Sequence, residues 1–375
     1  MSVTPDGRAL IAERLASQGL IRARFSRAAE VVEWHGAVQA QEYQPSKWAL
    51  ALRMRAAADA DVQREIDEGR ILRTHVMRPT WHYVAARDLV WMQRLTASRV
   101  QRGMQVYWRR MEIDGALLRR AAGVFERALR DGRHLTRADL GARLHRAGIA
   151  LSGYRLAHAA LYAELEAVIC SGPRVGKQST YALVAERAPR PRDLSGDEAL
   201  AELARRFFRS HGPATARDFA WWSNLTMTDA RRGADIIRAR AREVDGRTYW
   251  TLGSRAGLRV PQPLVHLLPV YDEYVVAYRD RALVPHGPAK VMGKPGYATF
   301  QHTVVIDGQV AGTWRAVRTA RGVRISMTPM RRLTAKELKG IEAAASRHGD
   351  FLGVPVTVDA ASGRGSGRSA RSAQP

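Results

Sequence analysis

The sequence is poor in cysteine and has no long apolar segments. Cys170 is the only cysteine among 375 residues, which excludes a disulfide within the chain and a cysteine-rich zinc site. No apolar run reaches the roughly 18 residues that a transmembrane helix needs. The N-terminus lacks a basic region followed by an apolar stretch, so we expect no signal peptide. These absences predict a cytoplasmic protein that is not bound to a membrane.

Acidic residues are scarce relative to basic ones. The formal net charge is +24, the isoelectric point is about 11.1, and all but six of the 60 basic residues are arginines. A GC-rich genome explains the preference for arginine over lysine, but not the excess of basic over acidic residues. A positive field of this size favours polyanions. We therefore expect a nucleic-acid-binding protein, with a soluble basic enzyme as the alternative.

Several kinds of catalytic site are missing. The stretch from Gly176 to Ser179 lacks the upstream glycine of a phosphate-binding loop, which argues against an NTPase. The sequence shows no cluster of carboxylates that could bind a metal, which argues against a metal-dependent nuclease. His75 and His82 have no evident third ligand, which argues against a zinc site. We expect neither a metal nor another cofactor.

A recurring order of elements is the main positive signal for the fold. Helical segments followed by two strands occur three times, and Thr136 and Thr215 each precede an aspartate by three residues, as in a helix-capping motif. We therefore predict a mainly α chain with some β structure, built from three tandem winged helices. One irregular helical domain is the alternative. The predicted strand pairs are 71–77 with 81–84, 168–170 with 180–184, and 242–245 with 248–252.

The chain is long enough for two or three domains with a substantial core. Beyond the third winged helix, Asp307-Gly308 lies between two strand-like segments and predicts a β-hairpin. The tail after residue 360 is rich in Gly, Ser and Arg. The predicted segments are 1–112 (first winged helix, glutamine motif and linking helices), 113–190 (second), 191–260 (third), 261–360 (C-terminal β/α region) and 361–375 (disordered basic tail).

Two glutamines separated by one residue are the candidate catalytic pair. Gln39 and Gln41 follow an amphipathic run, and Pro45 suggests the first position of the next helix. We expect the pair at a helix end or in the joint between helices, where an extended chain projects both side chains to one side. Neutral amides can hold a water and orient a substrate, but they accept protons poorly. The pair therefore suits a reaction whose leaving group departs easily. The alternative is that both glutamines are ordinary surface side chains without a catalytic role.

Two further clusters are ambiguous. His75 and His82 lie in a predicted strand pair that is unusually polar and cationic. They are either site residues or structural histidines held by hydrogen bonds. Asp272 and Glu273 are adjacent and point different ways on a regular element, so we expect them to pair with nearby arginines. The expected partners are Arg279 and Arg281. The alternative is that the two carboxylates act on a substrate as an acid/base pair.

Four stretches in order resemble the AlkZ-like bacterial DNA glycosylases, and the resemblance covers nearly the whole chain. The stretches are 36–41, 72–82, 268–274 with 278–281, and 310–314. Tyr271 and Val275-Val276 are conservative departures from the family's commoner Phe and Leu. The resemblance implies three winged helices that form a basic, C-shaped channel around duplex DNA. It also implies a catalytic motif of glutamine, any residue, then glutamine or aspartate, which Gln39 and Gln41 match.

The two-glutamine motif is similar to the branch associated with bulky alkylated guanines and with interstrand cross-links made by antibiotics. The implied function is a monofunctional DNA glycosylase that excises N7-alkylguanine adducts and unhooks cross-links, leaving an abasic site. Base-excision repair and antibiotic self-resistance in a bacterium are both compatible with this activity. We expect the protein to be a monomer. The rival is a non-enzymatic winged-helix DNA-binding regulator or architectural protein.

We expect basic side chains near the motif to contact phosphates, which supplies affinity without choice of sequence. Lys47 is the only lysine near the two glutamines, which makes Schiff-base chemistry and strand cleavage less expected. The candidate DNA-contacting residues are Lys47, Arg73, His75, Arg78, Thr80, Trp81, His82, Arg279 and Arg281.

Overall fold

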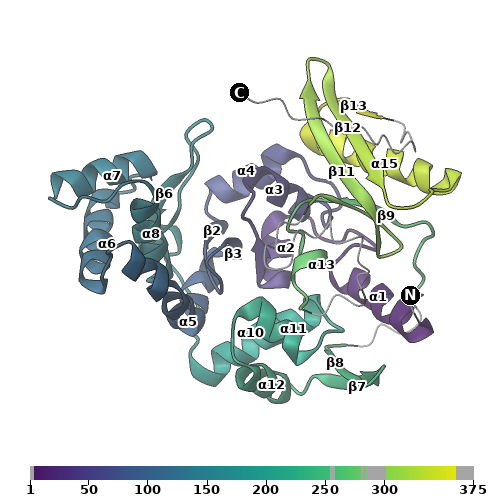
Figure 1. Ribbon diagram of the computed structural model, residues 1–375, viewed down its shortest axis with the longest axis horizontal. Coiled ribbons are helices and arrows are strands. Elements are labelled where there is room, and N and C mark those ends of the chain that lie inside the picture. Colours follow the sequence, from purple (N-terminus) through teal and green to yellow (C-terminus); the bar gives the residue numbers. More distant parts are fainter. Residues whose placement is uncertain (1–3, 254–257, 280–282, 284–300, 360–375) are drawn as a thin grey trace, which may run out of the picture. The chain divides into compact units, whose positions relative to one another are not determined.

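The computed structural model describes residues 4–253, 258–279, 283 and 301–359, and it has the predicted α+β composition (Figure 1). The chain divides into two compact units. One comprises Met1–Pro261 and Pro269–Pro285, and the other comprises Gln262–Leu268 and His286–Pro375. The division does not separate the first three predicted segments, so their boundaries at 112 and 190 stay predictions. The predicted tail of 361–375 lies outside the described residues.

The N-terminal part of the larger unit surrounds a small antiparallel sheet. The predicted strand pair is present as β2 and β3, and a third strand, β1, pairs with β3 in the order β1-β3-β2. Strand β1 was not predicted, because three residues are too few for a strand pattern. The elements are α1 (Pro5–Ser17), α2 (Ala28–His35), β1 (Ala37–Gln39), α3 (Tyr43–Ala51), α4 (Asp59–Asp67), β2 (Ile71–His75) and β3 (Trp81–Ala85).

Helix α5 (Leu89–Arg110) connects two hydrophobic cores of this unit. Its first turns place Leu89, Trp91 and Met92 in one core, while Val100 and Trp108 lie in the other. A helix of 22 residues is about 33 Å long, which is enough to reach both. The helix therefore fixes the distance between the parts of the chain that precede and follow it.

The middle part of the unit packs three helices against a second small sheet (Figure 1). Thr136 caps α7 as predicted, and its hydroxyl and Asp139 form a reciprocal capping box. The strands pair in the order β4-β6-β5. The elements are α6 (Gly115–Leu129), β4 (Leu135–Thr136), α7 (Arg137–Arg146), α8 (Gly153–Leu165), β5 (Ile169–Ser171), β6 (Thr180–Leu183) and α9 (Val184–Arg187).

The last helical part of the unit repeats the order of three helices and two strands. Thr215 forms the second predicted capping box, with Asp218. Phe207, Phe219 and Trp222 place this part in the same core as Trp91, so it packs against the N-terminal part. The elements are α10 (Gly196–Ser210), α11 (Ala216–Ser223), α12 (Met227–Ile236), β7 (Arg240–Val244) and β8 (Arg247–Thr251), followed after residue 268 by α13 (Glu273–Val276).

The smaller unit is a sheet with one long helix. The predicted hairpin at Asp307-Gly308 is present between β10 and β11, and Asp307 has a positive φ of 50°. The described strands lie in the order β13-β12-β11-β10-β9, and only β13 pairs in parallel. The elements are β9 (Val265–Leu268), β10 (Thr303–Ile306), β11 (Gln309–Thr319), β12 (Gly322–Pro329), α15 (Ala335–Leu352) and β13 (Val356–Val358).

Candidate active site

The segment with the two glutamines enters a sheet. Gly36 ends α2 with a φ of +86°, a conformation that glycine adopts at little cost, and β1 follows at once. Gln39 is the last residue of β1 and lies opposite His82 of β3, while Gln41 lies in the bend before α3. Both glutamines therefore lie in the segment that joins α2 and α3, as expected, and Gln39 is in an extended strand within it. Pro45 is the third residue of α3 rather than its first.

Gln39 is held by its main chain while its side-chain oxygen is unpaired. Its main-chain N–H donates a hydrogen bond of 2.7 Å to Oε1 of Glu273. The residue is 8% exposed, and its Oε1 accepts no hydrogen bond from the described part of the chain. A buried amide oxygen without a donor is costly, so this atom is an available acceptor in a fixed place.

Gln41 differs in its surroundings. Its Oε1 accepts a hydrogen bond of 3.3 Å from the main-chain N–H of Trp81, and its own carbonyl accepts one of 3.2 Å from Arg73. The residue is half-buried and lines a cavity of about 340 Å³. The oxygen of Gln41 therefore already accepts one hydrogen bond, whereas the oxygen of Gln39 accepts none from the described residues.

The cavity beside Gln41 combines arginines with aromatic rings. The guanidinium of Arg73 lies 4.2 Å from the ring centre of Trp81, and that of Arg174 lies 4.5 Å from the ring centre of Tyr43. Burial lowers the pKa of Arg73, although an arginine remains charged at neutral pH. Such a wall suits an anionic ligand. The lining residues are Gln41, Glu42, Tyr43, Ile66, Arg73, Trp81, Arg137, Glu164, Ser171, Gly172, Arg174, Ser179, Thr180 and Tyr181.

Behind Gln39, a buried carboxylate collects donors from three elements. Besides the Gln39 N–H, Glu273 accepts hydrogen bonds at Oε2 from Trp222 (3.1 Å) and from Nε2 of His211 (3.2 Å). Its exposed fraction is 1%. Burial by itself would raise the pKa of Glu273, but the hydrogen bonds from His211 and Gln39 bring it below its usual value. Glu273 is therefore an ionised group inside the protein.

The neighbouring carboxylate has a different partner from the one predicted. Asp272 forms two hydrogen bonds of 2.9 Å with Arg53, and both side chains are at most 1% exposed. Neither Asp272 nor Glu273 pairs with Arg279, whose main-chain N–H donates to Asp218. The expected role as structural partners holds for Asp272, but the predicted partner is wrong because Arg53 lies far away in the sequence.

Comparison with known proteins identifies the family. A family model described as "DNA glycosylase AlkZ-like" matches residues 32–351. The chain belongs to the AlkZ-like DNA glycosylase family. It is thus a DNA glycosylase that acts on DNA, which decides between the enzyme and the non-enzymatic regulator in favour of the enzyme.

A curated sequence and a solved structure from Streptomyces sahachiroi are similar to this AlkZ-like chain over most of their length. The curated "Interstrand DNA cross-link repair glycosylase" is 25% identical over 386 residues, which cover 94% of this chain and 98% of that protein. The solved structure of "DNA glycosylase AlkZ" has a TM-score of 0.77 and 23% identity, covering 94% of this chain and 99% of the other. This likeness supports the fold.

The two histidines that remained ambiguous are both buried in this AlkZ-like structure. His75 contacts Glu164 through Nδ1, and its ring lies 4.5 Å from that of Trp81. His82 donates through Nδ1 to the Thr80 carbonyl at 2.9 Å, because a carbonyl can only accept. Burial lowers the pKa of His82 to about 4, so it is neutral at pH 7. Both histidines are held by hydrogen bonds, and His82 also lies beside Gln39 in the sheet.

The other candidate DNA contacts divide by exposure. Lys47 is 1% exposed and pairs with Asp59 at 2.7 Å, which argues against a phosphate contact by its ammonium group. Arg78 and Arg279 both lie over the ring of Trp221, at 4.7 and 5.0 Å. Arg279 is exposed, whereas Arg78 and Thr80 are half-buried. Arg281 lies outside the described residues.

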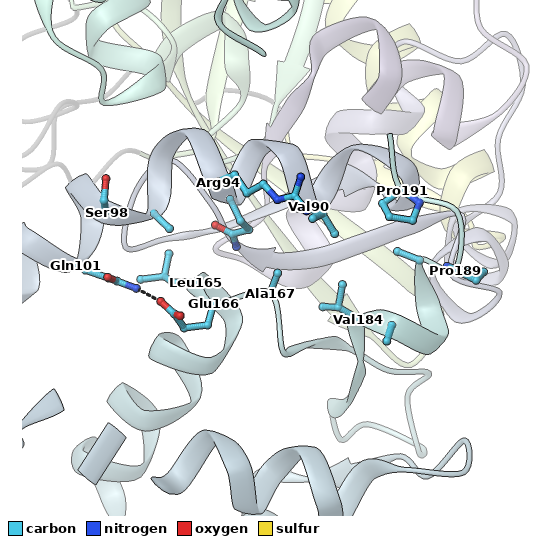
Figure 2. A pocket seen from close by; sticks show the side chains of 14 residues that line it. Val90, Arg94, Ser98, Gln101, Leu165, Glu166, Ala167, Val184, Pro189 and Pro191 are labelled. Atoms are coloured by element: carbon cyan, nitrogen blue, oxygen red, sulfur yellow. Dashed lines mark hydrogen bonds between the residues drawn. The ribbon is translucent and has the colours of Figure 1, made fainter. Parts of the chain in front are cut away.

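Another cavity, of about 680 Å³, is separate from the glutamines. Figure 2 shows its two walls, one from α5 with Arg94 and Gln101, the other from the chain after α8 with Glu166 and Pro191. Neither Gln39 nor Gln41 lines it.

Two features are absent from the described part of the chain. It contains no group of three or more His, Cys, Asp or Glu side chains placed to hold a metal ion. None of its helices has both the length and the apolar character needed to cross a membrane.

The residues that the sequence did not assign to the site are Glu273, His211 and Trp222. The sequence predicts an arginine partner for Glu273, which does not connect this residue with Gln39. His211 and Trp222 come from the region of α10 and α11, well over a hundred residues beyond the glutamines. No spacing rule connects them with Gln39, because their proximity depends on how two helical parts pack.

Proposed function

We propose that this glycosylase excises bulky N7-alkylguanine adducts from duplex DNA, unhooks interstrand cross-links and leaves an abasic site. The proposal includes a monomeric cytoplasmic enzyme with Gln39 and Gln41 as its catalytic residues. The observation that carries it is the buried, unpaired oxygen of Gln39 two residues from Gln41, which lines an arginine-rich cavity. The name of the Streptomyces sahachiroi relative, a cross-link repair glycosylase, supports the substrate class.

The chemistry follows from the charge of the leaving group. Alkylation at N7 makes the guanine cationic, and departure of the base neutralises it, so no general acid is needed. The enzyme then has to position a water and stabilise the positive charge that develops on the sugar. Neutral amides can position the water without accepting a proton, and the proton that the water loses as its oxygen bonds to the sugar passes to solvent water.

The hydrogen bonds of the two amides favour a division of roles. The free oxygen of Gln39 would accept a hydrogen bond from the attacking water and direct a lone pair of the water toward the sugar. The oxygen of Gln41 already accepts from Trp81, so its N–H groups would donate to an oxygen of the sugar or phosphate. Arg73 and Arg174 in the adjacent cavity would hold the phosphate nearby.

The three helical parts of the larger unit would act as three winged helices that form a basic, C-shaped channel. In each part, at least three helices precede a pair of antiparallel strands (β2 with β3, β5 with β6 and β7 with β8), which is the order of elements in a winged helix. A base tethered to both strands cannot rotate into a closed pocket, so an open channel fits a cross-linked substrate better than base flipping does.

The test is base release from duplexes that contain N7-alkylguanine or an interstrand cross-link. Wild type should produce abasic sites, and Gln39→Ala and Gln41→Ala should each slow release by about 100-fold or more while binding DNA normally. Lys47→Ala should lower only the stability of the protein and leave base release and DNA binding unchanged, since Lys47 is buried and paired with Asp59. Full activity of the Gln39 variant would refute its catalytic role, and absence of release from any alkylated duplex would refute the substrate class.

A further inference from the structure

The geometry points to Glu273 as a positioning residue that fixes Gln39 for catalysis. The inference rests on the proposed role of Gln39. Glu273 does not need to touch the substrate, because its Oε1 lies 2.7 Å from the main-chain nitrogen of Gln39. Gln39 ends a strand of only three residues, and the chain bends at Gln41, so the strand pairing alone provides few hydrogen bonds beyond this point.

The second oxygen of Glu273 is held from the other side. Trp222 of α11 and His211, just after α10, both donate to Oε2, at 3.1 and 3.2 Å. His211 is itself bonded through Nδ1 to the hydroxyl of Ser210 at 2.7 Å. The carboxylate therefore connects the end of β1 with two helices that begin more than 150 residues later in the chain. Movement of Gln39 would require all of these hydrogen bonds to adjust.

A carboxylate suits this position better than a neutral group of the same shape. Each of its oxygens only accepts, so it can bind donors on both sides, and an ionised acceptor makes a stronger hydrogen bond to a peptide N–H. A glutamine at position 273 would have one oxygen and one NH₂ group. Whichever way that amide turned, its NH₂ would face either the Gln39 N–H or the donors of Trp222 and His211.

A general structural role is the alternative, and the chain provides a matched example of one. Glu65 is also a buried carboxylate that accepts from main-chain N–H groups, at 3.1 Å from Ala28 and 2.9 Å from Ala29. It stabilises the start of α2 and makes no hydrogen bond with Gln39. Substitution of Glu65 or of Glu273 should therefore lower the stability of the protein. Only substitution of Glu273 should slow base release.

The experiment compares Glu273→Gln and Glu65→Gln in the full chain, with Gln39→Ala as the reference. The measurements are single-turnover base release at saturating enzyme, the Kd for the same duplex and the melting temperature. We expect Glu273→Gln to slow release by about 10- to 100-fold, since a small misplacement of a catalytic group has an effect of this size, with Kd unchanged. Glu65→Gln should lower only the melting temperature.

Equal release rates in wild type and Glu273→Gln, or an equal loss in Glu65→Gln, would overturn the inference. If Gln39→Ala itself keeps the wild-type rate, the proposed function of Gln39 has failed, and the inference fails with it for that separate reason. If Glu273→Gln does not fold, Trp222→Phe removes one donor and keeps the carboxylate. That variant should slow release about threefold or more at unchanged Kd, and an unchanged rate would overturn the inference.

Discussion

At the scale of single residues, the two candidate catalytic glutamines do not titrate, and two of their ionisable neighbours have shifted pKa values. The candidate catalytic side chains are amides. His82, opposite Gln39, is neutral because burial lowers its pKa to about 4. Glu273 stays ionised because hydrogen bonds from His211 and Gln39 lower its pKa despite the opposing effect of burial. The two amides, His82 and Glu273 thus keep their protonation states near neutral pH, where a histidine acting as a base would change its own.

The first prediction concerns the pH dependence of base release. Between about pH 6 and 8, the single-turnover rate of wild type on N7-alkylguanine duplex should vary by no more than about twofold. The measurement is release of the free base at each pH, corrected for spontaneous loss of base without enzyme. A bell-shaped profile with its limbs inside this range would show that a titrating acid or base takes part.

At the scale of elements, the glycine before β1 sets the direction of the segment that carries the two glutamines. Gly36 has a φ of +86°, and an added Cβ would lie 3.3 Å from the Arg206 side chain and 3.5 Å from Trp222. Three residues later the chain reaches Gln39. A change at this turn is therefore passed directly to β1 and to its contact with Glu273.

The second prediction is that Gly36→Ala lowers both stability and activity. The strained conformation should cost about 1–2 kcal/mol of unfolding free energy, and displacement of β1 should slow base release about tenfold or more. Gly148→Ala is the matched control, because Gly148 has a φ of +71° but no side chain or main chain near its Cβ position. Both variants should lose stability, measured by urea denaturation, and only Gly36→Ala should lose rate. Equal rates in the two variants would contradict the prediction.

At the scale of the whole molecule, charge is the dominant property. The net charge of +24 is spread over many arginines. Surface arginines bind phosphates by releasing counterions, so affinity for DNA depends on salt rather than on sequence. A glycosylase that searches for rare lesions in any sequence context needs this kind of binding.

The third prediction is a steep salt dependence on undamaged duplex. The Kd, measured by fluorescence anisotropy, should increase about 100-fold or more between 50 and 200 mM salt. Arg174→Gln, next to Gln41, should make the slope shallower by about one counterion. A Kd that is independent of salt would contradict a phosphate-based mode of binding.

The fourth prediction is a loss of stability on acidification. Burial lowers the pKa of His82 and His348 to about 4, and that of His35 well below its usual value. These groups take up protons only on unfolding, so stability is complete above about pH 6.5 and falls until the pH reaches the folded-state pKa. His82 alone should account for about 2 kcal/mol between pH 7 and 5. Equal unfolding free energies at the two pH values would contradict this.

The sequence by itself determined the α+β class, the three repeats of helices and strands, the threonine caps and the two glutamines as a candidate site. Each depends on neighbours within a few residues: periodicity, a capping residue three positions away, or a short motif. Only the tertiary structure decided that Gln39 ends a strand, that Asp272 pairs with Arg53, and that Glu273 contacts Gln39 together with Trp222 and His211. The last group comes from three regions of the chain, and which donors meet one buried carboxylate depends on the packing of helices across a shared core, which no local pattern encodes.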